Sequence, residues 1–456
     1  MKIKSRFDYD IVVIGSGDTG RRVALATAES GMRTAIVEAD KFGGSSLNYS
    51  DVPMGAMIHV SQLYRQAILG AKKGLSSNTL RYNYPTMLNW KNTAIRRAKS
   101  GTKQILEEAK VDFIQGTARV VSKYELSIGE KVIKAKKFLI ATGALTADTG
   151  IKIAKDVPFL LPTTVLDLAR PPRSIFIVGG GATGCEFAQY FSALGTQVVV
   201  ADIASRLLPR EDEEVGQVLD DLFNREHIKI LTQSRVVAIE KDGAHTRVIF
   251  LRDGQERSVK VDEVLLCTGH APQCDLGLEN VGVKYNQSGI IVDNRMRTTA
   301  KHVFAAGDVI GKHGSTQEKA IREANVATLH ITGRSKATIE YDDIIRTTNI
   351  FPEVAQVGMT EDDCLKRDRK ILKAIVPAGE SQKAIKTGFY SGFVKLICSK
   401  KDRRVLGGTV VLPNANIVAQ EIAIAVRYLM TAEELGNASH PVGEWGELVK
   451  LACQRI

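Results

Sequence analysis

The chain has 456 residues, 44% of them apolar, which is too long for one ordinary core and predicts two or three domains. No apolar run approaches the roughly 18 residues of a membrane span, and the first apolar run, at 11–14, is too short for a signal peptide. We therefore expect a cytoplasmic protein without integral membrane association. The net charge of +11 is spread over the whole chain, and its densest run, at 400–404, is typical of a solvated hairpin tip rather than a nucleic-acid site.

Cysteine spacing excludes two further classes of site. No two of the six cysteines stand at C-x-x-C spacing, so neither a zinc site nor a disulfide framework is indicated. We expect buried, reduced thiols at all six positions, which are Cys185, Cys267, Cys274, Cys364, Cys398 and Cys453.

The first chemical signal lies at the N-terminus. An apolar strand at 9–14 leads into the glycine loop 15–20, a helix, and a strand at 34–37 that ends at Glu38. In such a loop the first glycine makes the tight turn, the second lets the backbone approach a pyrophosphate, and the third lets helix and strand pack closely. The pyrophosphate is held by the free N–H groups of the helix N-terminus, and Glu38 is placed to bind a ribose.

The same order of elements returns in the middle of the chain. A strand at 174–178 leads into the glycine loop 179–184, a helix from about Cys185, and a strand at 197–201 that ends at Asp202. A single G-x-G-x-x-G is weak, but two complete units of strand, loop, helix, strand and acid predict two bound dinucleotides.

Three more buried strands run into turns or acids, at 138–143, 265–269 and 303–308. With these in place, the chain resembles the pyridine nucleotide-disulfide oxidoreductases over nearly its whole length, and within them dihydrolipoamide dehydrogenase and mercuric reductase. The order of motifs carries the resemblance, together with C-terminal matches at 351–361 and 392–408.

The resemblance implies an α/β fold with two Rossmann-like dinucleotide-binding domains and a C-terminal α+β dimerisation domain. The FAD domain is expected at 1–148 and 271–338, the NAD domain at 149–270, and the interface domain at 339–456, which implies a homodimer. Noncovalent FAD and NAD(H) are the expected cofactors, and no metal is expected.

Residues matching the family's binding motifs are carried over position by position. Those expected to hold FAD are Gly15, Gly17, Thr19, Gly20, Glu38, Ser45, Ser46, Thr117, Ala118, Ala141, Thr142, Gly143, Gly307 and Asp308. Those expected to hold NAD are Gly179, Gly181, Ala182, Thr183, Gly184, Glu186, Asp202 and Gly269. Asp202 favours NAD, because a carboxylate bonds the ribose 2′-hydroxyl and repels a 2′-phosphate. Arg206, four residues on, can soften that preference, but it also matches the Arg-x-Leu-Pro turn common in the family, at 206–209.

The redox loop departs from the family pattern. The family reads approximately G-G-T-C-L-N-V-G-C-I-P-S-K, whereas this chain has Ser46 at the first cysteine and Asp51 at the second. The lysine after the proline, which in the family lies near the flavin and an acid like Glu186, is replaced by Met54-Gly55. A hydroxyl and a carboxylate cannot form a disulfide.

The C-terminal segment departs in the same way. The family's pattern is about H-x-H-P-T-x-x-E, and a gapless alignment places His440 on the first histidine, Val442 on the catalytic one and Glu447 on the glutamate. A shifted alignment makes His440 catalytic with Glu444 as its partner. Otherwise His440 is a polar residue at a helix start.

These departures predict an NADH-dependent flavin oxidoreductase that reduces a non-disulfide acceptor directly, such as a quinone, a metal ion, a dye or oxygen. The sequence does not identify the acceptor. The alternatives are a catalytically silent FAD-binding scaffold and an atypical disulfide reductase using Cys453, which otherwise reads as a helix-packing residue. Asp51 is expected to have a raised pKa and to supply a proton to the acceptor, or else to be a solvated loop acid or a helix N-cap.

Overall fold

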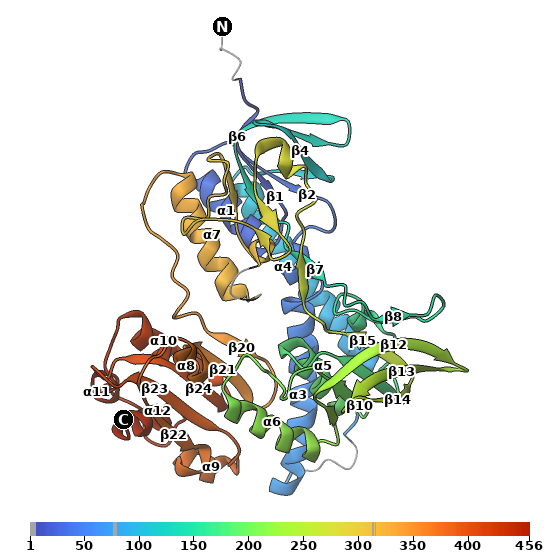
Figure 1. The fold of residues 1–456 in the computed structure, drawn as a ribbon, viewed down its shortest axis with the longest axis vertical. Coiled ribbons are helices and arrows are strands. Elements are labelled where there is room, and N and C mark those ends of the chain that lie inside the picture. Colours follow the sequence, from blue (N-terminus) through green and yellow to red (C-terminus); the bar gives the residue numbers. More distant parts are fainter. Residues whose placement is uncertain (1–5, 76–79, 312–313, 315) are drawn as a thin grey trace. The chain divides into compact units, whose positions relative to one another are not determined.

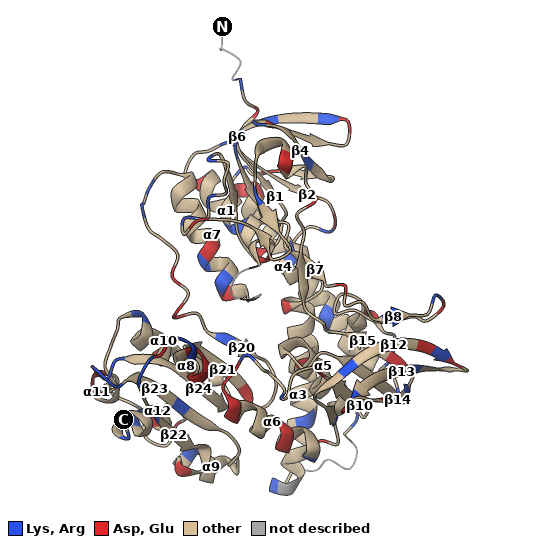
Figure 2. Ribbon diagram, viewed as in Figure 1, with Lys and Arg blue, Asp and Glu red and all other residues tan. Residues whose placement is uncertain are grey.

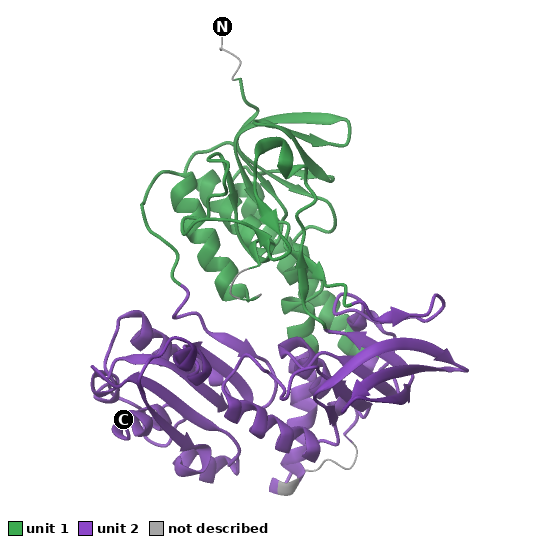
Figure 3. Cartoon of the chain, viewed as in Figure 1, with its two compact units in different colours: residues 1–57, 85–149, 268–340 green, residues 58–84, 150–267, 341–456 purple. Residues whose placement is uncertain are grey.

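The computed structural model describes residues 6–75, 80–311, 314 and 316–456, and the chain divides into two compact units. Unit 1 contains residues 1–57, 85–149 and 268–340, and unit 2 contains residues 58–84, 150–267 and 341–456 (Figure 3). Basic and acidic residues are interspersed along both units (Figure 2). No helix in the described part of the chain is long and apolar enough to cross a membrane.

Unit 1 is built on a mixed sheet with the order β3-β2-β1-β6-β5-β4, in which β19 also pairs with β6 (Figure 1). β1, β2, β3, β6 and β19 pair in parallel, and β4, β5 and β6 pair antiparallel. The strands of this sheet are β1 (Tyr9–Ile14), β2 (Thr34–Glu38), β3 (Asp112–Gln115), β4 (Ala118–Ser122), β5 (Glu125–Ile128), β6 (Lys131–Ile140) and β19 (Val303–Ala305). Unit 1 also contains two strand pairs, β7 (Ala144–Thr146) with β16 (His270–Pro272) and β17 (Tyr285–Asn286) with β18 (Gly289–Ile290).

The helices of unit 1 are α1 (Asp18–Glu29), α2 (Gly44–Asn48) and α7 (Gln317–Ile331), with most of α4 (Tyr84–Glu108) and the start of α3 (Asp51–Gly70). The central strand β1 has almost no accessible surface over Ile11–Ile14, as expected of a parallel strand covered on both faces. Because parallel strands end at one edge, the residues that follow β1, β2, β3, β6 and β19 meet there, and this edge carries the first candidate site.

Unit 2 contains a parallel sheet with the order β11-β10-β9-β15, a second sheet with the order β14-β13-β12-β8, and an antiparallel sheet with the order β20-β21-β24-β23-β22. Its strands are β8 (Lys152–Ile153), β9 (Ser174–Val178), β10 (Gln197–Ala201), β11 (Lys229–Leu231), β12 (Ser234–Asp242), β13 (His245–Arg252), β14 (Gln255–Val261), β15 (Glu263–Leu266), β20 (Arg346–Thr348), β21 (Glu353–Gly358), β22 (Ile371–Pro377), β23 (Phe393–Ser399) and β24 (Val405–Leu412). Its complete helices are α5 (Ala182–Ala193), α6 (Glu213–Arg225), α8 (Glu361–Lys366), α9 (Gln382–Thr387), α10 (Ala415–Arg427), α11 (Ala432–Gly436) and α12 (Glu447–Gln454).

The two faces of the antiparallel sheet differ in chemistry. Val394 and Leu396 belong to the core that includes residues of α10 and α12. The intervening residue Lys395 lies opposite Thr409, which lies opposite Gln356, so a buried polar row crosses three strands on the other face.

Most of the predicted elements are present, and one boundary prediction was wrong. The strands expected at 9–14, 34–37, 174–178 and 197–201 form. The run at 400–404 connects β23 to β24 as a hairpin tip. The helix expected from about Cys185 begins at Ala182, because the third glycine of the loop lies inside the first helical turn rather than before it.

Candidate functional site: two glycine loops and their surroundings

Close backbone contacts restrict two positions of the first glycine loop to glycine. Gly15 has φ +103°, and a Cβ there would lie 2.3 Å from the Ala141 carbonyl oxygen. A Cβ on Gly20 would lie 1.9 Å from the Gly15 carbonyl oxygen, so the strand, the turn and α1 pack only around glycine. Gly17, in contrast, faces open space, and a Cβ there would have no atom within 4 Å. The loop therefore leaves room for an anion at the N-terminus of α1.

Glu38 completes this loop from the end of β2. Its Oε2 accepts hydrogen bonds from the Ser16 N–H at 2.8 Å and the Ser16 hydroxyl at 2.6 Å, and its Oε1 accepts from the Asp40 N–H at 2.9 Å. Ser16 Oγ in turn accepts from the Gly43 N–H at 2.8 Å. The acid expected to bind a ribose thus also organises the loop, a second role that no sequence pattern indicated.

The second glycine loop, in unit 2, repeats the arrangement. A Cβ on Gly179 would lie 2.3 Å from the Cys267 carbonyl oxygen, and one on Gly184 would lie 1.8 Å from the Gly179 carbonyl oxygen. Gly181 faces open space. Asp202 accepts from the Gly180 N–H at 2.6 Å and from the Ala204 N–H at 2.7 Å, as Glu38 does in the first loop.

The Gly-Asp motif after β19 is held by a buried ion pair. Gly307 has φ +84°, and a Cβ there would lie 2.7 Å from Thr19 Oγ1 on α1. The Gly307 N–H donates to Glu323 at 2.7 Å, and Lys319 Nζ lies 3.7 Å from Glu323 and 4.0 Å from Asp308. Lys319 and Glu323 are almost fully buried on α7. Neither was predicted, although their i, i+4 spacing is a signal for such a pair.

Other expected FAD residues gather at the same strand edge. The Gly116 N–H donates to the Glu38 carbonyl at 2.7 Å, which brings the segment containing Thr117 and Ala118 beside the end of β2. The Ala141 N–H donates to the Ile14 carbonyl at 2.8 Å, and the Thr142 hydroxyl donates to the Gln273 carbonyl at 2.8 Å. The remaining three, Ser45 and Ser46 on α2 and Gly143 after β6, also belong to unit 1.

The expected NAD residue Gly269 belongs to unit 1, whereas the second glycine loop belongs to unit 2. The Gly269 carbonyl accepts from the Ala147 N–H at 3.0 Å. Within unit 1 it therefore connects the segments next to β7 and β16, and its link to NAD stays a prediction.

Ser46 and Asp51 face each other across the turn between α2 and α3. The Ser46 hydroxyl is close enough to the carboxylate of Asp51, the first residue of α3, to lower the pKa of that carboxyl. Asp51 is exposed in the single chain, and partial desolvation by the surrounding protein is the largest cause that raises its pKa. The negative charges of Asp18 and Asp308 raise it further, and the Ser46 hydroxyl opposes them. The direction expected for the Asp51 pKa is confirmed.

The C-terminal candidates do not form one cluster. The His440 side chain is only 3% exposed, with Nδ1 at 2.8 Å from the Ala438 carbonyl and Nε2 at 2.9 Å from Glu421 on α10. Glu444 instead pairs with Lys383 at 2.7 Å. The expectation of His440 at a helix start was wrong, because the residues after it form turns and α12 begins only at Glu447.

The other two positions of that pattern are separate. Val442 is 76% exposed, and Glu447 accepts from the Gly443 N–H at 3.1 Å in the turn before α12. The partner that the sequence did not indicate is Glu421, which lies 19 residues before His440. Burial raises the pKa of the Glu421 carboxyl, and the adjacent His440 opposes that shift.

The cysteines are free, and the expectation of burial holds for four of them. Cys185, Cys364, Cys398 and Cys453 are buried, whereas Cys267 and Cys274 are partly exposed. Burial raises the pKa of Cys453 to about 12, so this thiol is protonated at neutral pH.

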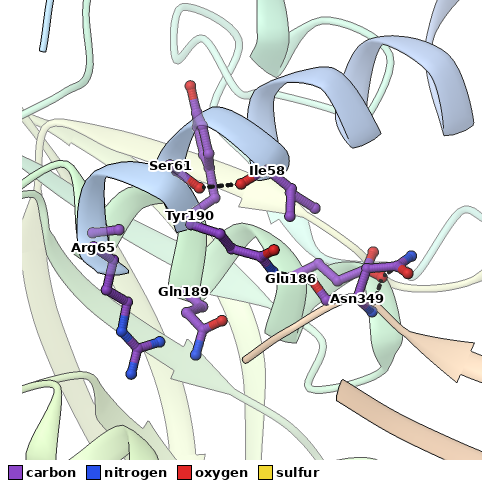
Figure 4. Close-up of a pocket in the computed structure, with 9 residues that line it drawn as sticks. Ile58, Ser61, Arg65, Glu186, Gln189, Tyr190 and Asn349 are labelled. Atoms are coloured by element: carbon purple, nitrogen blue, oxygen red, sulfur yellow. Dashed lines mark hydrogen bonds between the residues drawn. The ribbon is translucent and has the colours of Figure 1, made fainter. Parts of the chain in front are cut away.

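Glu186 is held by a partner that the sequence did not indicate. Its Oε1 accepts from both the backbone N–H of Asn349, at 2.6 Å, and the side-chain amide of Asn349, at 2.9 Å (Figure 4). The two residues line a cavity of about 10 Å³ together with Ser61 and Gln189. This volume is at the lower limit for one water molecule, so the cavity is not a dinucleotide site.

Comparison with known proteins identifies the family. Residues 9–330 match the family model described as pyridine nucleotide-disulphide oxidoreductase, and residues 344–452 match the dimerisation domain of the same family. The chain belongs to the pyridine nucleotide-disulphide oxidoreductase family. Members bind FAD and NAD(H), and the chain is an FAD- and NAD-dependent oxidoreductase of this family. Its dimerisation domain supports a homodimer.

The relatives cover almost the whole chain. A dihydrolipoyl dehydrogenase of Chlamydia muridarum is 30% identical over 93% of this chain and 91% of its own length. A mercuric reductase of Staphylococcus aureus is 27% identical over 98% of this chain and 82% of its own. The crystal structure of LpdA from Mycobacterium tuberculosis superposes with a TM-score of 0.89 at 24% identity, covering 98% of this chain and 99% of that one, which shows the fold.

The two glycine loops fit the family's cofactors. Each has one glycine facing open space at a helix N-terminus, and two glycines where a Cβ would collide with backbone. In unit 1 the turn at Gly307 and Asp308 lies against Thr19 of α1, so the FAD fingerprint and the Gly-Asp motif meet at one place.

Proposed function

We propose that the protein oxidises NADH through FAD and passes the electrons directly to a small non-disulfide acceptor, such as a quinone, a metal ion, a dye or oxygen. The main support for this proposal is that Ser46 and Asp51 stand at the two positions where the resemblance places the family's redox cysteines. Neither side chain exchanges with a disulfide or accepts an electron pair through sulfur. The family name and the names of the relatives describe reactions of those other proteins, and the proposal for this chain departs from them at the disulfide step.

Bound FAD would accept hydride from NADH and return two electrons to the acceptor. The residues of the chain itself bind and orient the reactants. The first loop, with Glu38, would hold the FAD diphosphate and ribose, and the second loop, with Asp202, would hold NADH. Asp51 would hold a proton at its carboxyl, because desolvation favours the neutral form, and would give it to the acceptor when this is a quinone, which takes up protons as well as electrons. Ser46 would orient that carboxyl.

The packing of Cys453 supports this proposal over a disulfide reductase that uses this thiol. Cys453 lies in the core between α12 and the antiparallel sheet, and its raised pKa keeps it from acting as a thiolate. His440, the alternative acid-base residue, is turned inward onto Glu421. We therefore assign no exchange chemistry to either residue.

A homodimer through the C-terminal domain is part of the proposal. Ile417, Ile424 and Tyr428 lie seven and four residues apart along α10 and its C-terminal end, so they fall on one side of the helix. They are 62%, 54% and 74% exposed within the single chain. Exposed apolar groups on a matched dimerisation domain are the kind of surface that a two-fold partner covers.

The test is an anaerobic stopped-flow titration of the purified yellow protein with NADH, followed by a panel of acceptors. We expect NADH to bleach the flavin, and a quinone, metal ion, dye or oxygen to restore its colour with multiple turnovers. The turnover rates of lipoamide and glutathione disulfide should not exceed the thiol-free background, whether or not the free thiols of the protein are blocked. A flavin that NADH does not bleach would refute the proposal in favour of a silent scaffold, and rapid turnover of a disulfide would refute it as well.

A further inference from the structure

Arg206 is the cation nearest in sequence to Asp202, the acid expected to bind the ribose of the nicotinamide dinucleotide. In the structure its guanidinium is engaged elsewhere. Arg206 Nη2 lies 3.5 Å from the Pro209 carbonyl, 3.4 Å from the Glu211 carbonyl and 3.3 Å from Asp362 Oδ2. Two of the three contacts fold the side chain back onto its own loop, and the third ties it to α8.

The aliphatic part of Arg206 lies in a space left by a glycine of α6. A Cβ on Gly216 would lie 3.1 Å from Arg206 Cβ and 3.2 Å from Arg206 Cδ, so any larger residue there would press against the side chain. Only 24% of the Arg206 side chain is exposed. Its Nε is buried without an acceptor among the described residues, so the engagement depends on Nη2.

Asp362 is fixed by the residues on both sides of it. Thr360 and Asp363 form a capping box at the start of α8. Glu361 donates its N–H to Asp212 at 3.0 Å, and its carboxylate lies 2.7 Å from the buried ammonium of Lys395. The first turn of α8 therefore has a defined position, and Asp362 presents a carboxylate to Arg206 from it.

We propose that Asp362 is a specificity-determining residue for the nicotinamide dinucleotide, because it retains Arg206 against Gly216 and away from the ribose. Asp202 is then the charged group that reads the 2′ position, and a 2′-phosphate meets a carboxylate without a compensating cation. An arginine near this position is what accommodates a 2′-phosphate in NADP-binding relatives of the Rossmann fold. This inference rests on the proposed use of NADH and names the residue that enforces it.

The experiment measures binding and needs no turnover. NAD⁺ and NADP⁺ are titrated by calorimetry into the FAD-loaded, oxidised protein, which neither ligand reduces. We expect wild type to prefer NAD⁺ and Arg206→Met to change the ratio of the two dissociation constants by less than about twofold, because Arg206 is already engaged elsewhere. Asp362→Ala should tighten NADP⁺ binding about tenfold, the effect of one new charge-assisted hydrogen bond, and leave NAD⁺ binding unchanged.

The double variant Asp362→Ala/Arg206→Met tests whether Arg206 provides the tighter NADP⁺ binding of Asp362→Ala. We expect this gain in NADP⁺ affinity to disappear in the double variant. Gly216→Ala, a favourable substitution in a helix, displaces Arg206 from the other side and should tighten NADP⁺ binding in the same direction. An unchanged NADP⁺ affinity in Asp362→Ala, or a gain that persists in the double variant, would overturn the inference. Normal NAD⁺ binding without turnover of any acceptor would refute the proposed function and leave this inference standing.

Discussion

At the first glycine loop, α1 begins with a charged turn, in which Asp18 pairs with the buried Arg21 and accepts from Gln317 of α7 at 2.5 Å. At the second loop, α5 begins with Ala182 and then buries Cys185 and Phe187. The backbone collisions that require glycine are nevertheless the same within 0.1 Å. Backbone geometry therefore fixes the dinucleotide loop, while the side chains around it differ between the two loops.

The largest effect is expected from substituting the glycines that face backbone atoms in each loop. Gly20→Ala and Gly184→Ala place a Cβ at 1.9 Å and 1.8 Å from a carbonyl oxygen, so each should destabilise its unit by about 3 kcal/mol, the upper range for overpacking. Gly17 and Gly181 face open space, so the matched controls Gly17→Ala and Gly181→Ala should keep the melting temperature of the cofactor-free protein. They should weaken FAD and NAD⁺ binding respectively. Equal melting temperatures for all four variants would show that the collisions do not determine the fold.

The charged surroundings of the first loop predict the next largest effect. Asp51→Asn should leave reduction of the flavin by NADH nearly intact and slow its reoxidation by a quinone about 10²-fold, the low end for loss of a general acid. Stopped-flow measurement of the two half-reactions separates these rates. Unchanged reoxidation with FAD still bound would leave Asp51 as a structural residue at the start of α3.

The raised pKa of Asp51 also gives this variant a signature in stability. The folded state binds the proton more tightly than the unfolded state, whose pKa is about 3.9. The stabilising contribution is therefore present at low pH, and it is lost as pH rises from the unfolded value through the folded one. Urea unfolding from about pH 3 to about pH 8, in buffers about one unit apart, should show this loss in wild type and not in Asp51→Asn.

The smallest effect is expected from a difference in how the two loops hold their acids, Glu38 and Asp202. Ser16→Ala removes the hydroxyl that donates to Glu38 and accepts from Gly43, whereas the second loop has Gly180 at this position and no such hydroxyl. We expect a loss of about 1–2 kcal/mol in unit 1 and weaker FAD binding, with NAD⁺ binding unchanged. The measurements are FAD dissociation and calorimetric NAD⁺ binding. Unaltered FAD affinity would show that the Ser16 backbone N–H suffices to hold Glu38.

The sequence predicted the parts of the site that depend on local patterns. Glycine spacing after a buried apolar strand depends on short-range backbone collisions, so both loops and their acids were found. The pairings of Asn349 with Glu186, of Glu421 with His440 and of Asp362 with Arg206 were missed. These partners lie on different elements, and no local rule of periodicity or capping brings them together. The start of α5 was misplaced because a glycine was read as a helix boundary.

The polar row of Gln356, Thr409 and Lys395 has a consequence for how the antiparallel sheet assembles. Side chains alternate between the faces of a strand, so a slip of β23 by one residue would turn Lys395 into the apolar layer beneath α10 and α12. The same slip would leave Asp212, 3.3 Å from the Lys395 ammonium in the native pairing, buried without its cation. The polar row therefore specifies one register of β23 in the sheet and makes the neighbouring registers unfavourable.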